Sequence, residues 1–305
     1  MNWSTAKVAL LYGGRGAEAQ VSRASAVAVT EAMRALGIEP IEIDVRDDYV
    51  AALSAACPTH AFNLVHGRPG EDGVLQGVCC ALGIPLTGSG LAASALALDK
   101  PKTKLVWMAT GLPTAPMMTV TTVAQADECI TRLGKELFVK PAHEGSSVGA
   151  YAVRGPEALR EALAKALLHD TEVLVEPCLP GPEYTVAVLQ GQALPVIGIR
   201  PLSGFYDYTA KYEVDTTEYA IPSGLTEDQE QEAQALAIRA FDALGCRTWG
   251  RIDFMLDAQG ELMLVECNTV PGMTNHSLVP KAARAAGIEM PQLIERILSE
   301  AEVSL

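Results

Sequence analysis

Four polar side chains face one another across a predicted β-hairpin in the last fifth of the chain. Two apolar runs flank a turn at 257–260, which is the pattern of two antiparallel strands. If the pairing is centred on that turn, Asp253 lies opposite Glu266. Arg251 then lies opposite Asn268. Because side chains alternate along a strand, all four point to the same face of the hairpin.

A divalent cation is the simplest reason for two carboxylates to face each other in a sheet. Asp253 and Glu266 repel each other and are costly to desolvate unless a cation lies between them. Mg²⁺ takes oxygen ligands and completes its shell with water and phosphate, so this pair with Asn268 suits it better than it suits zinc. The alternative is a solvated hairpin face with a surface Asp and Glu. The rigid turn at 270–274 lies beside the polar face and favours the metal site.

A glycine- and serine-rich loop is the second candidate, and it could bind phosphate. It joins two predicted strands and runs from Lys140 to Gly149. Glycine lets backbone N–H groups approach an anion, Ser146 and Ser147 add donors, and Lys140 adds positive charge. The alternative is an ordinary long hairpin loop. The loop is not a Walker loop, since no Gly-x-x-x-x-Gly-Lys-Ser/Thr string occurs in the chain.

Further cations lie near predicted loops. Lys100 and Lys102 follow an Ala-rich run, and Lys211 lies beside Tyr212. Each of these lysines, taken alone, is more often a surface side chain.

A glycine turn follows the first predicted strand and imitates a dinucleotide site. Its glycines, Gly13, Gly14 and Gly16, do not have the spacing Gly-x-Gly-x-x-Gly. Glu18 places a negative charge where a pyrophosphate would lie, so it suits an amino group better. His66, at the end of a neighbouring predicted strand, is a further candidate, although a lone histidine is more often structural.

Composition excludes several classes of function. The chain has 305 residues, of which 49% are hydrophobic and 20% charged, which is typical of a globular protein of two or three domains. Its net charge of -14 opposes binding to nucleic acid or to an anionic membrane. We expect a cytoplasmic protein, because no signal peptide pattern or membrane-length apolar run occurs. Its seven scattered cysteines indicate free thiols rather than a disulfide or zinc framework.

The elements that must position these groups follow an α/β pattern. Besides the hairpin, strands are predicted at 8–12, 41–45, 61–65, 136–140, 150–153, 172–175 and 184–189. The first of them alternate with an Ala-rich helix, which predicts a parallel sheet. A later helix has Thr226 as N-cap, Gln229 at the capping-box position and Gly245 as its stop.

Ordered motifs along nearly the whole chain resemble the D-alanine–D-alanine ligases of the ATP-grasp superfamily. The matching segments are Ala17-Glu18, Val21-Ser22, His66-Gly67, Gly70-Glu71-Asp72-Gly73, Gly88-Ser89-Gly90, Asp99-Lys100, Glu144-Gly145-Ser146-Ser147-Val148-Gly149, Tyr206-Asp207-Tyr208, Ala210-Lys211-Tyr212, Gly250-Arg251-Ile252-Asp253, Glu266, Asn268-Thr269, Pro271-Gly272-Met273-Thr274 and His276-Ser277-Leu278.

The resemblance implies an α/β protein with the ATP-grasp fold and three domains. The expected units are an N-terminal Rossmann-like substrate domain over 1–98, a central ATP-grasp subdomain over 99–183 and a C-terminal ATP-grasp subdomain over 184–305. ATP would lie between the last two units, and D-alanine between ATP and the first. The resemblance also implies a homodimer in the cytoplasm with no nucleic acid or membrane partner.

The implied reaction joins two D-alanine molecules for peptidoglycan precursor synthesis, with ATP as co-substrate. The carboxylate of the first D-alanine attacks the γ-phosphate to give an acyl phosphate, and the amine of the second then expels phosphate. Asp253, Glu266 and Asn268 would hold two Mg²⁺ ions, or Mn²⁺ in their place, that bridge the phosphates.

The resemblance assigns the other roles residue by residue. The implied ATP-binding residues are Lys100, Lys140, Ser147, Glu176, Leu179, Glu183 and Lys211. The implied substrate-binding residues are His66, Ser277 and Leu278. The implied catalytic residues are Glu18, Ser146, Tyr212, Arg251 and Gly272. Arg251 and the backbone N–H of Gly272 would stabilise the oxyanion, and Glu18 would bind the first ammonium group. Glu18 would also form a hydrogen-bonded set with Ser146 and Tyr212 that excludes water.

Three positions bear on the details of this resemblance. Tyr212 stands where D-lactate-using relatives often carry Phe, which favours the dipeptide as product. Ala19-Gln20 replaces a charged pair of many relatives, and His143 replaces an arginine. Histidine is shorter than arginine, so His143 bears on loop closure and ATP binding.

Two alternative functions have weaker support in the sequence. A nicotinamide-dependent oxidoreductase needs a phosphate-compatible glycine turn, which Glu18 opposes. A non-catalytic ATP sensor could lack a metal carboxylate or the oxyanion arginine, and this chain has Asp253, Glu266 and Arg251. The handedness of the substrate follows only from the resemblance.

Overall fold

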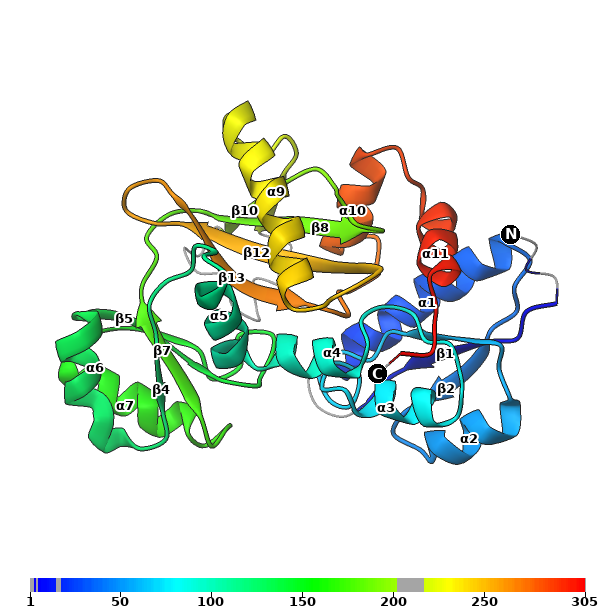
Figure 1. Ribbon diagram of the computed structural model, residues 1–305, viewed down its shortest axis with the longest axis horizontal. Coiled ribbons are helices and arrows are strands. Elements are labelled where there is room, and N and C mark those ends of the chain that lie inside the picture. Colours follow the sequence, from blue (N-terminus) through cyan, green and yellow to red (C-terminus); the bar gives the residue numbers. More distant parts are fainter. Residues whose placement is uncertain (1–2, 4, 15–17, 202–216, 305) are drawn as a thin grey trace.

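Three β-sheets with helices packed against them lie side by side along the long axis of a computed structural model (Figure 1). The structure describes residues 3, 5–14, 18–201 and 217–304, and all elements below belong to these residues. The N-terminal sheet lies at one end of the molecule, a four-stranded sheet lies at the other end, and a six-stranded sheet lies between them.

The N-terminal sheet is parallel, as its alternation of strands and helices predicts. Its strands, in the order β2-β1-β3, are β1 (Val8–Tyr12), β2 (Ile41–Asp44) and β3 (His60–Asn63). Its helices are α1 (Ala19–Ala35), α2 (Tyr49–Ala56), α3 (Val74–Ala81) and α4 (Leu91–Leu98). Strand β3 ends at Asn63, whose side chain accepts from the Val65 N–H at 2.9 Å and donates to the Gly70 carbonyl at 2.8 Å. These bonds fix the loop that carries His66.

The four-stranded sheet is antiparallel and carries the predicted phosphate loop. Its strands, in the order β4-β7-β5-β6, are β4 (Met118–Val120), β5 (Glu136–Pro141), β6 (Tyr151–Arg154) and β7 (Val173–Pro177). Its helices are η1 (Val123–Gln125), α6 (Ala126–Leu133) and α7 (Pro156–Ala166). Leu137, Val139 and Leu163 belong to the buried core of this unit. The loop joins β5 to β6 at the edge of the sheet.

The six-stranded sheet contains the predicted metal hairpin. Its strands are β8 (Glu183–Leu189), β9 (Gln192–Ala193), β10 (Ile197–Pro201), β11 (Thr217–Ala220), β12 (Trp249–Leu256) and β13 (Leu262–Asn268), in the order β11-β10-β8-β12-β13 with β9 paired to β8. The remaining helices are α5 (Lys100–Ala109), α9 (Glu227–Ala243), α10 (Leu278–Ala285) and α11 (Met290–Ser299).

Helix α9 confirms the predicted capping box and covers one face of this sheet. The Thr226 hydroxyl accepts from the Gln229 N–H at 3.3 Å, and the Gln229 side chain accepts from the Thr226 N–H at 3.2 Å. Phe241 of α9 lies against β12 so closely that a Cβ at Gly250 would come within 2.5 Å of its ring. Glycine at position 250 therefore lets the helix reach the sheet, and the polar side chains occupy the opposite face.

The pairing of β12 with β13 confirms the predicted register at the polar residues. Asp253 pairs with Glu266, and Arg251 pairs with Asn268. Directly opposite side chains lie on the same face of an antiparallel pair, so these four groups converge.

A β-bulge at Val265 lies between these pairs and the turn. The pairing predicted from the sequence, which was centred on the turn, contained no bulge. Phe254 pairs with Leu264, not with Val265, so Val265 is the extra residue. Leu262 and Leu264 are buried on the core face. Without the bulge Glu266 would follow them into the core, because side chains alternate with a period of two. The bulge therefore turns Glu266 toward the opposite face.

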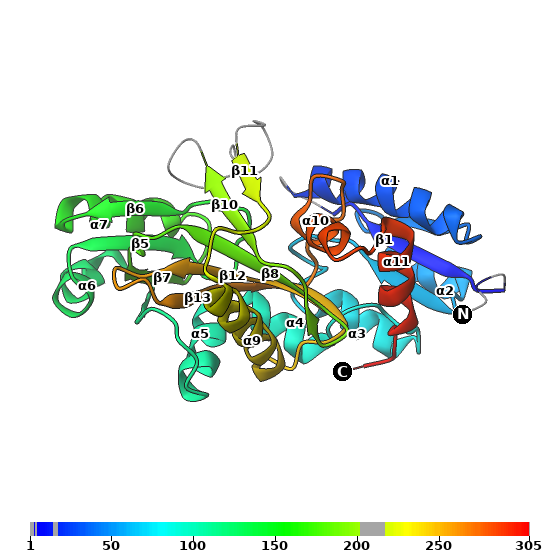
Figure 2. The ribbon, with the colours of Figure 1, turned by 90° about the horizontal axis from the view of Figure 1, so that it is seen from above.

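The end of the chain returns to the N-terminal sheet. Helix α11 lies beside α1 (Figures 1 and 2), and Ile297 and Leu293 share one hydrophobic core with Val29 and Met33. This core also includes Trp249 of the six-stranded sheet. Packing across these units forms one wall of the cavity described below, while the domain bounds 1–98, 99–183 and 184–305 remain predictions.

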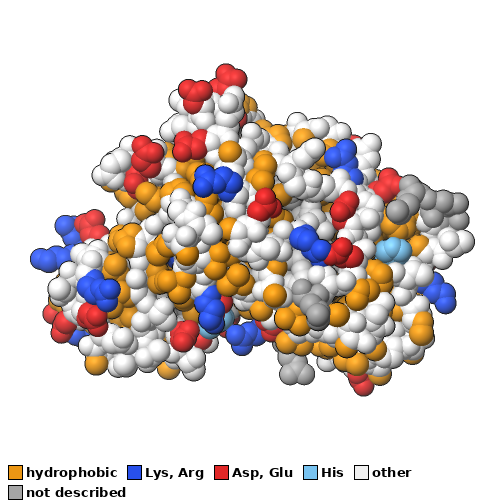
Figure 3. Space-filling view, viewed as in Figure 1, with side chains coloured by type: hydrophobic (Ala, Val, Ile, Leu, Met, Phe, Trp, Pro, Cys, Tyr) orange, Lys and Arg blue, Asp and Glu red, His pale blue; other side chains and the backbone are white. Residues whose placement is uncertain are grey.

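Charges of both signs are interspersed on the face seen in Figure 3. Hydrophobic side chains gather on this face around α5, where Leu105 and Met108 are exposed. None of the helices among the described residues is both long enough and apolar enough to span a membrane.

Candidate active site

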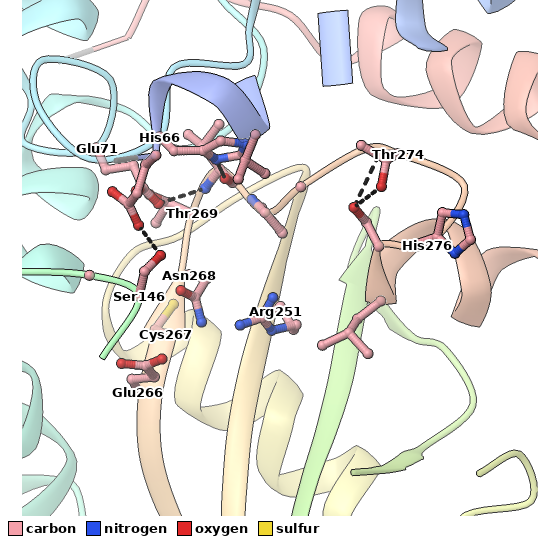
Figure 4. Close-up of a pocket in the computed structure, with 18 of the residues that line it drawn as sticks. His66, Glu71, Ser146, Arg251, Glu266, Cys267, Asn268, Thr269, Thr274 and His276 are labelled. Carbon is pink, nitrogen blue, oxygen red and sulfur yellow. Dashed lines mark hydrogen bonds between the residues drawn. The ribbon is translucent and has the colours of Figure 1, made fainter. Parts of the chain in front are cut away.

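A cavity of about 730 Å³ lies where the N-terminal sheet, the phosphate loop and the β12–β13 hairpin meet (Figure 4). Ten of the predicted site residues line it, and they come from segments far apart in the sequence. They are Glu18, His66, Lys100, Ser146, Arg251, Glu266, Asn268, Gly272, Ser277 and Leu278. The tertiary fold thus brings the larger part of the predicted set into one space.

Glu18 and Ser146 meet at one end of this cavity. Ser146 Oγ donates a hydrogen bond to Glu18 Oε1 at 2.6 Å. Ser146 and Ser147 have φ angles of 50° and 60°, in the left-handed region that costs a non-glycine residue energy. A Cβ at Gly145 would lie 2.6 Å from Glu18 Oε1, so glycine is needed for this approach. The phosphate loop is therefore tied to the N-terminal unit.

His66 and Glu71 line the same end, and backbone groups of Val270 hold both. The carbonyl of Val270 lies 2.7 Å from His66 Nδ1, which must carry the hydrogen because a carbonyl only accepts. Burial lowers the pKa of His66 in spite of the nearby Glu18 charge. Glu71 accepts from the N–H of Gly67 at 2.7 Å and from that of Val270 at 3.2 Å. Burial and the Glu18 charge raise the pKa of Glu71 to about 8.

The carboxylate of Asp253 lies beneath the cavity, only 3% exposed, and accepts four hydrogen bonds. Arg251 donates from Nε to Oδ1 and from Nη2 to Oδ2, each at 2.8 Å. Thr185 Oγ1 donates to Oδ1 at 2.6 Å, and Asn268 Nδ2 donates to Oδ2 at 3.0 Å. Sequence analysis gave Thr185 no role. Thr185 could have been recognised as a polar residue two positions after Glu183 in an otherwise apolar strand. This spacing places Thr185 and Glu183 on the same face of the sheet as Asp253.

The donor set of Asp253, Glu266 and Asn268 fits a hard divalent cation. Two carboxylates and an amide oxygen suit Mg²⁺, which leaves the rest of its shell to water and phosphate. Within the part of the chain that the structure describes, no three His, Cys, Asp or Glu side chains form a metal cluster, and here the third donor is an amide. Because four donors already occupy Asp253, ligation of a metal requires at least one of them to move.

Glu176 lies between two lysines, away from the cavity lining. Its Oε2 is 2.6 Å from Lys104 Nζ, and its Oε1 is 2.8 Å from Lys140 Nζ. All three side chains are buried. Burial by itself would raise the pKa of Glu176, but the two lysine charges outweigh it and lower the pKa to about 2. Sequence analysis missed Lys104, although it lies four residues after Lys100 and so on the same face of α5.

Lys100 and His143 hold the base of the phosphate loop. Lys100 Nζ donates to the Glu144 carbonyl at 2.5 Å, and burial lowers its pKa. The His143 ring lies between two carboxylates, with Nδ1 2.8 Å from Asp170 and Nε2 3.2 Å from Asp99. In place of the expected arginine, the imidazole therefore joins the loop to the start of α5 and to the segment before β7.

The other predicted ATP-binding residues do not line this cavity. Ser147 follows Ser146 in the phosphate loop, Leu179 is half-buried between β7 and β8, and Glu183 begins β8 opposite Met255. Two further predictions, Lys211 and Tyr212, lie outside the described residues.

The far wall of the cavity is the turn after β13 and the start of α10. Ser277 Oγ accepts from the Thr274 N–H at 3.0 Å and lies 2.9 Å from the Thr274 hydroxyl. A Cβ at Gly272 would come within 2.8 Å of Ser277 Oγ, so glycine lets the turn lie against the helix. Ser277 is the N-cap of α10, but its side chain does not cap the helix. The Ser277 hydroxyl therefore makes no capping bond to the first N–H groups of α10.

Similarity to known proteins agrees with this geometry. The family model for the D-ala D-ala ligase C-terminus matches residues 106–299. The D-alanine–D-alanine ligase of Ectopseudomonas mendocina is 50% identical over 294 residues, which cover 96% of this chain and 94% of that protein. The chain belongs to the D-alanine–D-alanine ligase family. D-alanine–D-alanine ligase B of Pseudomonas putida is 49% identical, and the match covers 96% of this chain and 92% of that protein.

Solved structures of the family confirm the predicted fold. The D-alanine–D-alanine ligase of Bacillus anthracis superposes with a TM-score of 0.86 at 31% identity, over 97% of each chain. The VanG D-Ala:D-Ser ligase of Enterococcus faecalis has a TM-score of 0.85 at 29% identity, over 97% of this chain and 99% of that one. The α/β architecture of three sheets is thus the ATP-grasp architecture of this ligase family.

Proposed function

We propose that this member of the family joins two D-alanine molecules to D-alanyl-D-alanine at the expense of ATP. The observation that carries the proposal is the cavity itself, where acidic Glu18, basic Arg251 and the N-terminus of α10 meet. An amino acid carries one charge of each sign, so a site for two of them needs groups of both signs. The matched relatives are named D-alanine–D-alanine ligases, and one solved structure of the family contains ATP.

Glu18 would bind the ammonium group of the first D-alanine. Its carboxylate accepts a hydrogen bond from the Ser146 hydroxyl at 2.6 Å, which orients it at the end of the cavity. His66, neutral because its pKa is lowered, can lie beside this ammonium without repelling it. We include Tyr212 in this set on the strength of the family motif alone.

The nucleotide would lie between the four-stranded and the six-stranded sheets. Lys100, Lys140 and Lys211 would neutralise phosphate oxygens, and the N–H groups of the loop at Ser147 would wrap a phosphate. Glu176, Leu179 and Glu183 would contact the adenine and the ribose. Glu176 is held as a carboxylate by its two lysines, so it can accept a hydrogen bond from the nucleotide.

Asp253, Glu266 and Asn268 would hold two Mg²⁺ ions, or Mn²⁺, which would supply positive charge to the transferring phosphoryl group. Arg251 is oriented by Asp253 at the floor of the cavity. Its guanidinium and the N–H of Gly272 would stabilise the oxyanion that forms when the second amine attacks the acyl phosphate. Ser277 and Leu278 would hold the carboxylate of that second D-alanine.

Phosphate release from ATP and Mg²⁺ tests the proposal directly. We expect release, with formation of the dipeptide measured by mass spectrometry, when D-alanine is added. L-alanine alone should give neither. D-serine in a mixture with D-alanine measures how strictly the second site selects its substrate. Release with L-alanine only, or no dipeptide with D-alanine, would contradict the proposed activity.

We also propose that the enzyme acts in the cytoplasm as a homodimer. Cytoplasmic ATP supplies its co-substrate, and the family resemblance supplies the dimer. Light scattering coupled to gel filtration would give about twice the chain mass of 32.3 kDa if the dimer forms.

A further inference from the structure

The turn that carries Gly272 is held on its β13 side by two side chains of the N-terminal unit. The N–H of Val270 donates to Glu71 at 3.2 Å, and the carbonyl of Val270 accepts from His66 Nδ1 at 2.7 Å. Figure 4 shows His66 and Glu71 together on one side of the cavity. Both polar backbone groups of Val270 are therefore fixed by the N-terminal unit.

A serine of helix α1 holds the same turn on the other side of Gly272. The N–H of Met273 donates to Ser25 Oγ at 3.0 Å, and both residues are fully buried. Val21 lies one helical turn before Ser25, and its Cγ1 is 3.8 Å from the position that a Cβ at residue 272 would occupy. Side chains four residues apart share a helix face, so one face of α1 packs against this turn. Ser25 has no part in the roles above.

These three hydrogen bonds hold the peptide groups on both sides of the Gly272 N–H. The Val270 carbonyl belongs to the peptide plane between 270 and 271, and the Met273 N–H belongs to the plane between 272 and 273. The N–H of Gly272 lies in the plane between them, and none of the three bonds uses it. Pro271 restricts the backbone further, because its ring fixes φ. The direction of the Gly272 N–H thus depends on the two planes beside it.

A fixed direction matters for a group that is to stabilise a transient charge. A backbone N–H lowers the barrier most when it is aimed at the oxyanion before the negative charge appears. Glycine is required at 272 because a Cβ would come within 2.8 Å of Ser277 Oγ. Glycine is also the residue with the freest backbone, so its N–H needs support from its neighbours. On the Met273 side, Ser25 gives that support.

We propose that Ser25 is a positioning residue for the ligation: its hydroxyl fixes the Met273 peptide and thereby directs the Gly272 N–H to the oxyanion of the second step. This inference rests on the proposed function, in which Gly272 is an oxyanion donor. Ser25 acts through the turn and touches no reacting atom. The N-terminal unit, which supplies Glu18 for the first amino acid, would then also orient a donor for the attack by the second.

The test is the variant Ser25→Ala, which removes the acceptor and leaves the helix intact. The Met273 N–H would then turn toward another partner, because a buried N–H without an acceptor is costly. Outright loss of an oxyanion donor lowers kcat by about 100- to 1,000-fold, and a donor that is only loosened should cost less. We expect kcat to fall about tenfold, while the KM values for ATP and for both D-alanines change less than about threefold.

Ser94→Ala is the matched control for the loss of a buried hydroxyl. Ser94 is also fully buried in a helix of the N-terminal unit, its Oγ donates to one backbone group, the Ser89 carbonyl, at 3.2 Å, and it does not line the cavity. Both variants should lower the urea midpoint by similar amounts, but Ser94→Ala should change kcat less than about twofold. Equal losses of kcat in the two variants would overturn the inference.

A single-turnover experiment separates positioning from a general structural defect. With enzyme in excess over ATP, ADP reports the first step and the dipeptide reports the second. In Ser25→Ala, ADP should form within about twofold of the wild-type rate, and the dipeptide about tenfold more slowly. Equal slowing of both products, or an unchanged kcat, would overturn the inference while the proposed function stands. If the wild-type protein forms no dipeptide, the proposed function fails first and this inference fails with it.

Discussion

Two buried or half-buried glutamates on opposite sides of the site have pKa values that are shifted in opposite directions. On the side where we propose that the nucleotide binds, Glu176 touches Lys104 and Lys140, and its pKa is lowered to about 2. On the side where we propose that the amino acid binds, Glu71 accepts hydrogen bonds from two backbone N–H groups and faces the charge of Glu18, and its pKa is raised to about 8. Burial acts in the same direction on both, so the difference comes from the charges nearby.

This difference matches what each side is proposed to bind. A polyphosphate brings up to four negative charges, which lysines can neutralise. Lysines that are already paired with one carboxylate are not left as uncompensated buried charges when no polyphosphate is bound. An amino acid brings an ammonium group, which an uncompensated acidic region attracts. The proposed site thus has a lysine-rich half around Glu176 and an acidic half around Glu18 and Glu71, and Asp253 with Arg251 lies between them.

Asp253→Asn is the strongest test of that division, because Asp253 has a cation partner as Glu176 does but belongs to the proposed reacting centre. Asparagine keeps the shape, and it removes the charge that orients Arg251 and that would attract a metal. We expect phosphate release to fall by about a thousandfold, which is ~4 kcal/mol of transition-state stabilisation. Asp257→Asn, in the turn of the same hairpin, should change the rate less than about twofold. Wild-type rates in Asp253→Asn would remove Asp253 from the mechanism.

Glu176→Gln tests the proposed nucleotide side by its effect on the free energy of unfolding. The substitution leaves Lys104 and Lys140 buried without their counter-charge, and breaking such a pair costs about 3–5 kcal/mol. The pKa of Glu176 is lowered in the folded protein, so its contribution is present above the unfolded value near 4.5 and is lost as the pH falls toward 2. Urea unfolding at pH 7 and at pH 3 should therefore show a smaller difference between wild type and variant at the lower pH.

The exposed pair of Glu161 and Lys165 supplies the control for that experiment. Their atoms also lie close, at 2.7 Å, but both side chains are more than half exposed. Glu161→Gln should leave the urea midpoint unchanged. Equal losses in both glutamine variants would show that burial of the Glu176 pair is not what stabilises the protein.

The sequence predicted the paired residues of the hairpin for a reason that was only partly correct. A centred turn gives Asp253 opposite Glu266, and the structure has that pair. Near the turn, however, Phe254 pairs with Leu264, and only the bulge at Val265 restores the predicted register. A bulge depends on how β13 packs on both faces, which a count of residues from a turn does not contain.

Contacts between distant segments account for most of what the sequence did not predict. The motif around Lys100 predicted a lysine that would bind the nucleotide. No local pattern in the sequence indicates that Lys104 is buried against β7 while Lys102 remains exposed. Glu71 was visible as part of a family motif, but its raised pKa depends on Glu18, which belongs to another segment. Local pattern predicted helices, caps and strands well because those signals are contained within a few residues.

Glu71→Gln tests the proposed amino-acid side through the pH dependence of stability. The folded chain keeps the Glu71 proton up to about pH 8, whereas the unfolded chain releases it near 4.5. The folded state therefore binds more protons between these values, and wild-type stability should fall relative to the variant as the pH rises through this range. The slope cannot exceed about 1.4 kcal/mol per pH unit for a single proton. Unfolding curves measured from pH 5 to pH 8 give the stability difference at each pH. A constant difference would mean that Glu71 is ionised like an ordinary surface carboxylate, and the contrast with Glu176 would then lose its electrostatic cause.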